Sequence, residues 1–429
     1  MKFTRLADWL RWQESLHPSA IDLGLERPRS VWTRLGASRV PVVIAVGGTN
    51  GKGSCVAFLE AILRHAGYRT GCYTSPHLVR YNERIAIDGE PVSDEVLMSA
   101  FQRVEETRGD TRLTYFEFGT LAALDIFARS RLDVAVLEVG LGGRLDAVNI
   151  IDADVSVITT VGVDHVEWRG TDRVSVGRDN AGLFRRGRPA VVADPDPPAS
   201  VLNAADALDC PLWIAGRDYR FDAGPNDWTW HGPDVVRRGL PVPVMRGRHQ
   251  LSNAAAAIAV LQRAAGRLPV DQRAIRSGLL NARVQGRFQV LEGRPSVVLD
   301  VAHNPDAAAV LADNLRHLPR PGRVLAVFGA LAEKDTAGIL APFASVVDHW
   351  YLASPDSPRA LSPDALATTL CDSMPDASHE VAGSVVEALA AASAAAGEDD
   401  IIVAFGSFFV VGEILEQIGK KSSQVPVPS

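Results

Sequence analysis

The feature that most constrains this chain is an apolar stretch that runs directly into a glycine-rich loop. Residues 42–46 are Val-Val-Ile-Ala-Val, a composition typical of a buried strand. The loop 47–53 reads Gly-Gly-Thr-Asn-Gly-Lys-Gly, and a helical pattern follows from Ser54 to His65. Glycines let backbone N–H groups turn toward an anion, and the N-terminus of a helix attracts negative charge. A strand, a glycine loop and a helix in this order predict a phosphate-binding loop.

Two side chains of this loop have the chemistry that a nucleoside triphosphate needs. The Lys52 ammonium can reach the terminal phosphates, and the Ser54 hydroxyl can hold Mg²⁺. The spacing departs from the usual G-x-x-x-x-G-K-[ST] pattern, because Val46 occupies the first glycine position and Gly53 separates the lysine from the serine. A chance glycine turn is the alternative, but the strand, loop, lysine, hydroxyl and helix all occur in the expected order.

Composition and charge restrict the class of protein that surrounds the loop. The chain has 429 residues, of which 47% are hydrophobic and 22% charged, enough for two or three globular domains. A formal net charge of −7 argues against a general nucleic-acid-binding surface. The sequence shows no signal-peptide core and no apolar run of membrane-helix length. Its four cysteines lack metal-ligand or disulfide spacing. We therefore expect a cytoplasmic protein that binds neither nucleic acid nor a membrane.

The first half of the chain alternates strand and helix patterns, which predicts a parallel α/β sheet. The expected strands after the loop are residues 68–74, 133–138 and 154–161. The expected helices are residues 4–16, 93–108 and 116–130, with Ser93 as an N-cap. Residues 210–247 have the composition of a small antiparallel subregion, and Ser252 is expected to cap an alanine-rich helix that ends near residue 265.

A second α/β pattern follows a boundary near residues 286–294 and has no phosphate loop of its own. Its expected strands are residues 296–300, 323–328, 346–352 and 400–404, and a last helix is expected at 408–418. We predict an N-terminal ATP-binding domain at 1–288, a C-terminal Rossmann-like α/β domain at 289–420 and a disordered tail at 421–429.

Polar groups that could hold a metal stand at the strand ends of the first half. Ser75 follows the second strand, Glu138 ends the third and His165 follows the fourth. The carboxyl ends of parallel strands meet at one edge of a sheet, so with Ser54 these groups form a candidate Mg²⁺ site. Each also has a plain structural interpretation: a turn serine before proline, a solvated carboxylate and a hydrogen-bonded histidine.

The second half carries one segment with similar chemistry, residues 300–305. Asp300 could bind a ribose hydroxyl, and His303 could meet a phosphate or an acyl phosphate. The alternative is a helix start, because Asn304 followed by Pro305 fits an N-cap and a first helical position. Both interpretations can hold at once. Arg287, near the boundary, could reach nucleotide phosphates or be an ordinary surface arginine.

Five segments together resemble the bacterial dihydrofolate synthase/folylpolyglutamate synthase family of the Mur ligase superfamily. These segments are residues 48–54, 75–78, 115–120, 138–146 and 300–305. The resemblance covers about residues 9–418. It implies a P-loop ATPase domain and a Rossmann-like domain with the site between them. It also implies a monomeric ligase that uses ATP and Mg²⁺ to join L-glutamate to dihydropteroate and to reduced folates through an acyl phosphate.

The resemblance also implies roles for individual residues. Contacts with ATP fall to Asn50, Gly51, Lys52, Gly53, Asn253, Arg287 and Asp300. The magnesium ligands are Ser54, Ser75, Glu138 and His165. The pterin pocket is formed by Asp22, Leu23, Gly24, Phe116, Glu117, Phe118 and Gly119, with Leu145 beside it. The candidate catalytic residues are Lys52, Glu138, His165 and His303.

Two positions depart from the pattern of the family. Asn180 stands where the family often has a carbamylated, metal-bridging lysine, and Phe409 stands where close relatives carry histidine. The first departure predicts one firm magnesium site and a weak second one. The second departure weakens any detailed assignment of the glutamate pocket.

Three other functions are compatible with a phosphate loop. They are a peptidoglycan-type amino-acid ligase, a P-loop kinase or regulatory NTPase, and a non-catalytic folate- or nucleotide-binding protein. The pterin-like segments argue against the first, and the second α/β domain argues against the second. The third would follow if Asn180 marked a lost activity. Release of ADP on mixing ATP, dihydropteroate and glutamate would separate these functions.

Overall fold

The computed structural model describes residues 2–17, 19, 22–36, 41–164, 172–318 and 322–423, and it divides into two compact units. Unit 1 comprises residues 1–76, 82–244 and 250–283, and unit 2 comprises 77–81, 245–249 and 284–429. The main division thus lies at 283/284, against the 288/289 expected from composition. The short segments 77–81 and 245–249 group with unit 2. For the first of them, Leu78 packs on a hydrophobic cluster of that unit.

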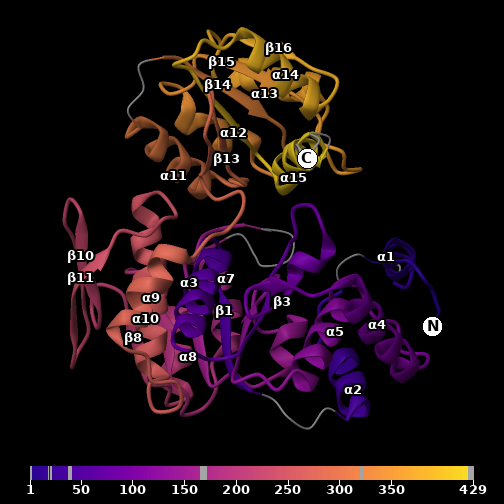
Figure 1. Ribbon diagram of the computed structural model, residues 1–429, viewed down its shortest axis with the longest axis vertical. Helices are drawn as coiled ribbons and strands as arrows, with labels where there is room; N and C mark the ends of the chain where they lie inside the picture. Colours follow the sequence, from indigo (N-terminus) through magenta and orange to yellow (C-terminus); the bar gives the residue numbers. More distant parts are fainter. Residues whose placement is uncertain are drawn as a thin grey trace, which may run out of the picture. The chain divides into compact units, whose positions relative to one another are not determined.

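Unit 1 is built on an eight-stranded sheet in the order β4-β3-β2-β5-β1-β6-β7-β8. Figure 1 labels β1, β3 and β8 of this sheet. Its strands are β1 (Val42–Gly47), β2 (Thr70–Tyr73), β3 (Ile85–Ile87), β4 (Glu90–Pro91), β5 (Val134–Glu138), β6 (Val155–Ile158), β7 (Ala190–Val192) and β8 (Leu212–Ile214). The six strands from β2 to β8 in this order are parallel, and β3 and β4 form an antiparallel edge. β1 lies between β5 and β6 and is buried along its whole length, as its apolar sequence predicts.

Helices complete unit 1. They are α1 (Leu6–Glu14), α2 (Glu26–Leu35), α3 (Lys52–His65), α4 (Asp94–Arg108), α5 (Tyr115–Arg129), α7 (Arg173–Asn180), α8 (Ala199–Ala207), α9 (Arg248–Arg263) and α10 (Gln272–Asn281). The predicted N-cap at Ser93 is confirmed, since its side chain accepts a hydrogen bond from the Val96 N–H. α10 packs closely on α3, because a Cβ at Gly278 would lie 2.6 Å from the Ile62 Cα.

The predicted cap at Ser252 is wrong. α9 begins four residues earlier, at Arg248, directly after Gly247, whose φ of 106° ends the preceding segment. Ser252 therefore lies inside the helix. The cap signal failed because residues 248–251 continue the helical pattern, and Gln250 and Asn253 on this helix are buried.

Within the antiparallel subregion predicted for residues 210–247, residues 212–214 instead form β8, which pairs parallel with β7 in the main sheet. The rest of the prediction is confirmed by a three-stranded antiparallel sheet. It consists of β9 (Arg220–Ala223), β10 (Asp227–His231) and β11 (Val236–Pro241). Trp228 and Trp230 of β10 are buried, and the Trp230 Nε1 donates to the Ala255 carbonyl at 3.0 Å. This hydrogen bond ties the small sheet to α9.

Unit 2 is a second α/β sheet in the order β12-β13-β17-β14-β15-β16 (Figure 1). Its strands are β12 (Gln289–Leu291), β13 (Ser296–Leu299), β14 (Val324–Phe328), β15 (His349–Leu352), β16 (His379–Val381) and β17 (Ile401–Phe405). All pairs are parallel except β12 with β13. In unit 1, sequence analysis missed β3, β4 and β7, of which β7 is buried but only three residues long. The two strands that it missed in unit 2, β12 and β16, are three-residue edge strands without a buried residue. They lack the apolar run by which the central strands were recognised.

Two separate hydrophobic clusters pack against the strands of unit 2, as a Rossmann-like domain requires. The helices are α11 (Pro305–Arg316), α12 (Thr336–Leu340), α13 (Pro363–Ser373), α14 (Val385–Ala395) and α15 (Phe408–Ser423). One cluster includes residues of α11, α12 and α13, and the other includes residues of α14 and α15. α15 continues to Ser423, so the tail predicted to begin at residue 421 starts too early, and residues 424–429 lie outside the described residues.

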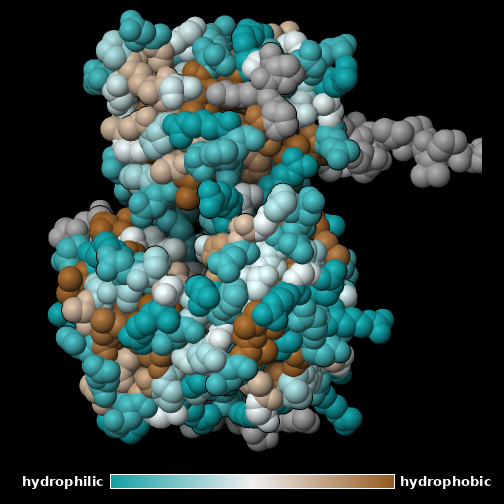
Figure 2. Space-filling model, turned by 90° about the vertical axis from the view of Figure 1, so that its left-hand side faces the viewer, coloured by the Kyte–Doolittle hydropathy of each residue, from teal (hydrophilic) through white to brown (hydrophobic). Residues whose placement is uncertain are grey.

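The surface of the protein is mixed in character. Figure 2 shows hydrophilic side chains over most of one face, with hydrophobic residues in small separate groups. Within the described ranges, no helix combines the length and the apolar composition that crossing a membrane would require.

Candidate active site

The loop between β1 and α3 has a backbone that only glycine can follow at two positions. Gly48 has φ 125° and Gly51 has φ 87°. A Cβ at Gly48 would lie 2.2 Å from the Thr159 Oγ1, and one at Gly51 would lie 2.5 Å from the Asn253 Oδ1. Gly51 is the N-cap of α3, and no side chain caps the first turn of that helix. The loop thus presents the N-terminus of α3, which suits a phosphate group.

The side chain of Lys52 folds back over this loop. Its Nζ donates to the Gly48 carbonyl at 3.0 Å and to the Thr49 carbonyl at 3.1 Å. Because Lys52 is also the first residue of α3, its charge is held at the place where the loop meets the helix. The phosphate-binding role of Lys52 stays a prediction.

A chain of side-chain hydrogen bonds connects Ser54 to α9. The Gln250 Nε2 donates to the Ser54 Oγ at 3.2 Å, and the Gln250 Oε1 accepts from the Asn253 Nδ2 at 3.1 Å. All three residues are buried. The structure therefore brings together Ser54 and Asn253, as predicted, through Gln250. Sequence analysis missed Gln250, although its place three residues before Asn253 puts both on one face of a helix.

Glu138 and Ser75 meet at the ends of adjacent strands. The Glu138 side chain is buried, and its Oε2 accepts from the Ser75 N–H at 3.2 Å. Burial and, to a smaller extent, the charge of Glu138 raise the pKa of the Cys55 thiol to about 12. Glu138 also pairs in register with Val46 of β1, just before the loop that leads into α3. Ser54, Ser75 and Glu138 are thus assembled at one edge of the sheet, as expected.

These groups suit a magnesium ion that is held mainly by phosphate oxygens and water. Among the residues that the structure describes, no three His, Cys, Asp or Glu side chains cluster as a metal site. The protein offers two hydroxyls and one carboxylate instead, which are hard oxygen ligands of the kind that Mg²⁺ takes alongside substrate phosphates. His165, the fourth predicted ligand, lies outside the described residues.

One arginine joins the two segments that were predicted to form the pterin pocket. The Arg27 Nη1 lies 2.9 Å from the Asp22 Oδ2, and its Nη2 donates to the Glu117 Oε1 at 3.0 Å. The Glu117 Oε2 also accepts from the Thr114 N–H at 2.8 Å, within a capping box at the start of α5. Leu23 and Gly24 lie in the same short loop as Asp22, before α2.

Two aromatic residues of the predicted pocket differ in environment. Phe118 is fully buried, with its ring centroid 5.8 Å from that of Trp12 and 5.7 Å from that of Phe101, as a core residue would be. The Phe116 ring lies against the backbone of Gly140, where a Cβ would be 2.6 Å from its Cζ. Gly119, one helical turn further on, is also buried.

The loop after β5 is held by a buried carboxylate and by a second loop. The Asp146 carboxylate accepts from the N–H groups of Leu141 and Val148, both at 2.9 Å. Burial, with a smaller contribution from the charge of Asp179, raises the pKa of Asp146 to about 7, although its backbone hydrogen bonds act in the opposite direction. Leu145, predicted to lie beside the pterin, is partly exposed next to Asp146. The Asp179 carbonyl accepts from the Arg144 N–H at 3.0 Å, and Asn180 is fully buried beside it.

Four residues of unit 2 lie close together after the end of β13, namely Arg287, Asp300, His303 and Phe408. The Asp300 Oδ2 accepts from the Phe288 N–H at 2.7 Å, and its Oδ1 accepts from the Ala302 N–H at 2.8 Å. Burial raises the pKa of Asp300, while Arg287 and His303 act in the opposite direction. Asp300, Arg287 and His303, predicted from separate parts of the sequence, therefore share one local environment.

Phe408 is the residue of this group that sequence analysis missed. The Arg287 Cζ lies 5.4 Å from the centroid of its ring, and the His303 ring centroid lies 5.6 Å from it. The His303 Nδ1 donates to the Val301 carbonyl at 2.8 Å, which assigns the ring a proton on Nδ1. Phe408 was overlooked because an apolar residue at the start of a helix carries no functional signal.

Both interpretations of residues 300–305 hold in part. Asn304 is the N-cap of α11, accepting from the Ala307 N–H at 2.9 Å, and Pro305 takes the first helical position. This cap explains Asn304 and Pro305 without any ligand. It does not account for His303, whose ring packs on Phe408.

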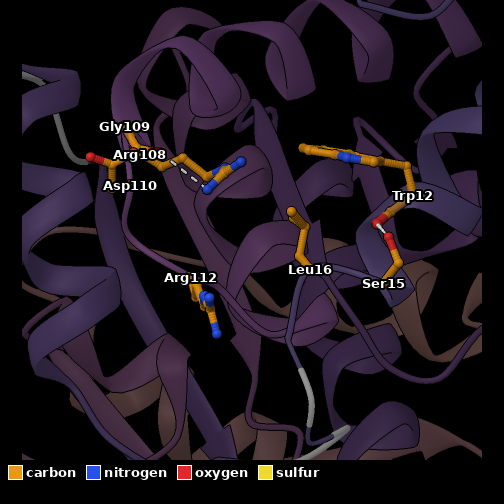
Figure 3. A pocket seen from close by; sticks show the side chains of 7 residues that line it. All are labelled: Trp12, Ser15, Leu16, Arg108, Gly109, Asp110 and Arg112. Atoms are coloured by element: carbon orange, nitrogen blue, oxygen red, sulfur yellow. Dashed lines mark hydrogen bonds between the residues drawn. The ribbon is translucent and has the colours of Figure 1, made fainter.

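A further hollow of about 670 Å³ lies in unit 1, at the C-terminal ends of α1 and α4 (Figure 3). It is lined by Trp12, Ser15, Leu16, Arg108, Gly109, Asp110 and Arg112. None of the predicted site residues lines it. The Arg108 guanidinium is occupied by Glu105 and by the carbonyls of Gly109 and Thr111, so it serves the local fold.

Comparison with known proteins finds relatives along nearly the whole chain. Residues 286–408 match the family described as Mur ligase, glutamate ligase domain. The chain is 44% identical over 419 residues to the dihydrofolate synthase/folylpolyglutamate synthase of Escherichia coli, covering 97% of this chain and 96% of that one. It is 37% identical to the protein of the same name from Haemophilus influenzae, covering 95% and 96% of the two chains.

Solved structures give the same result. E. coli FolC in complex with DHPP and ADP matches with a TM-score of 0.93 and 43% identity, covering 98% of this chain and 99% of that one. A bifunctional folylpolyglutamate synthase/dihydrofolate synthase with Mn, AMPPNP and L-glutamate bound matches with a TM-score of 0.89 and 43% identity, covering 97% and 98%. Sequence and fold agree over nearly the whole length, so the chain belongs to the dihydrofolate synthase/folylpolyglutamate synthase family of the Mur ligases.

Proposed function

We propose that this protein is an ATP-dependent ligase that joins L-glutamate to 7,8-dihydropteroate and adds further glutamates to reduced folates. One observation carries the proposal. Glu138, the last residue of β5 and a predicted magnesium ligand, lies only two residues before Gly140, against which the Phe116 ring lies. A pterin substrate beside Phe116 would therefore have its site next to the phosphates of ATP.

In the first step, a carboxylate oxygen of dihydropteroate attacks the γ-phosphorus of ATP, and ADP leaves. Lys52 and the N-terminus of α3 stabilise the negative charge on the phosphoryl group as it is transferred. A bound Mg²⁺ would add positive charge at the phosphate oxygens, and Ser54, Ser75 and Glu138 are the described residues that would hold it. The product of this step is an acyl phosphate.

In the second step, the α-amine of L-glutamate attacks the acyl carbon. The tetrahedral intermediate collapses, the C–O bond to the phosphate breaks, and inorganic phosphate leaves as the amide forms. Exclusion of water protects the acyl phosphate from hydrolysis during this step. The same two steps on the γ-carboxylate of a folate would lengthen its glutamate tail.

Unit 2 would contribute to nucleotide binding through Arg287, Asp300 and His303. Both carboxylate oxygens of Asp300 accept a backbone N–H, yet each carboxylate oxygen has room for a second hydrogen bond, such as one from a ribose hydroxyl. Arg287 would meet phosphate oxygens. His303 would meet the phosphoryl group or the acyl phosphate.

Asn180 sets the metal requirement of this chain apart from that of relatives with a lysine at this place. Its side chain can offer only a neutral carbonyl oxygen, which Mg²⁺ binds less strongly than an anionic one. Between Lys2 and Lys334, Lys52 is the only lysine, so no nearby residue in the sequence can replace the missing carbamate. We therefore propose one firm magnesium site and a second that is weak or formed by ATP oxygens and water.

We also propose that the enzyme acts as a cytoplasmic monomer without a nucleic-acid or membrane partner, which its net charge of −7 supports for nucleic acid. The main test is an ADP-release assay with ATP, Mg²⁺ and L-glutamate. It compares three acceptors: dihydropteroate, tetrahydrofolate and a muramyl-peptide precursor. We expect ADP with the first two acceptors only. Release with the muramyl precursor alone would favour a peptidoglycan-type ligase, and no release with any acceptor would favour a binding protein.

A further inference from the structure

The contacts of Arg27 go beyond those of an ordinary surface ion pair. Arg27 lies in the first turn of α2. Its guanidinium contacts three acceptors: the Asp22 carboxylate at 2.9 Å, the Asp22 backbone carbonyl at 2.7 Å and the Glu117 carboxylate at 3.0 Å. A single side chain therefore fastens the loop that contains residues 22–24 to the start of α5.

The burial of the partners shows that this contact matters for the fold of the pocket. The Glu117 side chain is only 4% exposed, whereas those of Arg27 and Asp22 are 29% and 39% exposed. A carboxylate as buried as Glu117 needs compensation for the water that it loses. Arg27 and the Thr114 N–H supply that compensation.

Both ends of this bridge adjoin residues that were assigned to the pterin. Asp22 and Glu117 are themselves two of them, and Glu117 directly follows Phe116, whose ring lies on Gly140. We propose that Arg27 is a positioning residue, which sets the separation of Asp22 and Phe116 and thereby the affinity for dihydropteroate. This inference rests on the proposed function, because it takes that pocket to hold the pterin.

The geometry requires arginine rather than any positive charge. A guanidinium is a planar fork that can donate to several acceptors in fixed directions, whereas a lysine ammonium is a compact charge on a flexible stem. Lysine at position 27 would keep the positive charge beside Glu117. It could not contact the Asp22 carboxylate, the Asp22 carbonyl and the Glu117 carboxylate in the same arrangement.

The test compares Arg27→Gln and Arg27→Lys with Arg29→Gln. Arg29 is an exposed residue two positions further along α2, so its substitution removes the same charge from the same helix. For Arg27→Gln we expect the KM for dihydropteroate to rise about tenfold, because small misplacements of a substrate are costly. We expect Arg27→Lys to lie in between, and Arg29→Gln to match the wild type. The KM for ATP should stay within about twofold in all three.

A double substitution distinguishes a positioning role of Arg27 from a direct contact between Arg27 and the substrate, and circular dichroism detects a loss of fold. If Arg27 acts by placing Asp22, then Asp22→Asn combined with Arg27→Gln should raise the dihydropteroate KM no further than the larger single effect. Circular dichroism would confirm that each variant is folded, and Arg27→Lys decides the matter if Arg27→Gln does not fold. An unchanged dihydropteroate KM in the folded variant, or an equal rise in the KM for ATP, would overturn the inference. Absence of dihydrofolate synthesis by the wild type would instead overturn the proposed function.

Discussion

The phosphate-loop edge of unit 1 and the β13 edge of unit 2 are both strand ends of a mostly parallel sheet, yet they present their chemistry differently. In unit 1 the main groups are contiguous, from Gly48 to Ser54, and two of the glycines are required by backbone geometry. In unit 2, Arg287, Asp300, His303 and Phe408 come from three separate segments, and Asp300 already has structural hydrogen bonds. A site made by backbone geometry should therefore fail sharply when altered, whereas one made by dispersed side chains should weaken gradually.

The largest effect is expected for Lys52→Ala. The variant removes the ammonium that lies over the loop, and we expect kcat for ADP formation to fall by about a thousandfold or more with the fold intact. Lys420→Ala is the matched control, since Lys420 is exposed on α15, where its Nζ lies 3.0 Å from the Glu416 carboxylate. Near-normal ADP formation by folded Lys52→Ala would refute the phosphate-loop assignment.

The second test distinguishes the backbone strain caused by an alanine at positive φ from the steric clash that would change the shape of the phosphate loop. Gly51→Ala would place a Cβ 2.5 Å from the Asn253 Oδ1 at a φ of 87°. Gly67→Ala has nearly the same strain, with φ 90°, but no atom within 4 Å of the new Cβ. Both should lower the free energy of unfolding by about 1–2 kcal/mol. Only Gly51→Ala should lower kcat/KM for ATP, by about a hundredfold. Equal activity in the two variants would contradict the account of the loop.

The third test concerns the pterin pocket in unit 1. Phe116→Ala and Asp22→Ala remove an aromatic wall and a carboxylate that suits the N–H groups of a pterin. We expect each to weaken dihydropteroate binding by about tenfold, measured by titration calorimetry. Phe118 is a poor control because it is a core residue. Unchanged affinity in both variants would move the pterin site elsewhere, and a milder loss for tetrahydrofolate would indicate separate sites for the two substrates.

A smaller effect is expected in unit 2. Phe408→Leu keeps an apolar side chain but removes the aromatic face under Arg287 and beside His303. We expect the KM for ATP to rise about three- to fivefold, the size of one partly exposed cation–π contact. Phe408→Tyr should behave like the wild type, and so should Phe409→Leu, because Phe409 is 38% exposed. A loss as large as that of Gly51→Ala would show that the two edges do not differ as described.

The smallest effect is expected for bicarbonate. Because Asn180 cannot be carbamylated, added bicarbonate should leave kcat unchanged, and a Mn²⁺ titration of the nucleotide complex should find one tight site per chain. Packing of Asn180 as an ordinary buried residue, with Asp179 as the metal ligand instead, is the alternative. Two fully occupied metal sites that include a protein carboxylate in place of the carbamate would contradict the proposal.

The same contrast explains what could be predicted from the sequence. The longer buried strands and the phosphate loop were predictable, because burial demands apolar runs and the loop demands glycine at fixed places. The three-residue strand β7 was missed although it is buried, because its apolar run is too short. The roles of Gln250, Arg27 and Phe408 were not, because each depends on partners that are distant in sequence or on a helix face. The N-cap predicted at Ser252 was wrong because a cap signal is local. It does not take into account the preceding residues 248–251, which belong to α9. Segments 77–81 and 245–249 join unit 2 through tertiary packing, which a linear pattern does not contain.

The central claim is an acyl phosphate formed by attack of a substrate carboxylate on ATP. The most direct measurement uses dihydropteroate that carries ¹⁸O in its carboxylate, together with unlabelled ATP and L-glutamate. Mass spectrometry of the released inorganic phosphate then reports the fate of the oxygen. We predict one ¹⁸O atom in each phosphate, because the oxygen that attacks the γ-phosphorus leaves with it when the amide forms. Unlabelled phosphate accompanied by amide formation would contradict the mechanism.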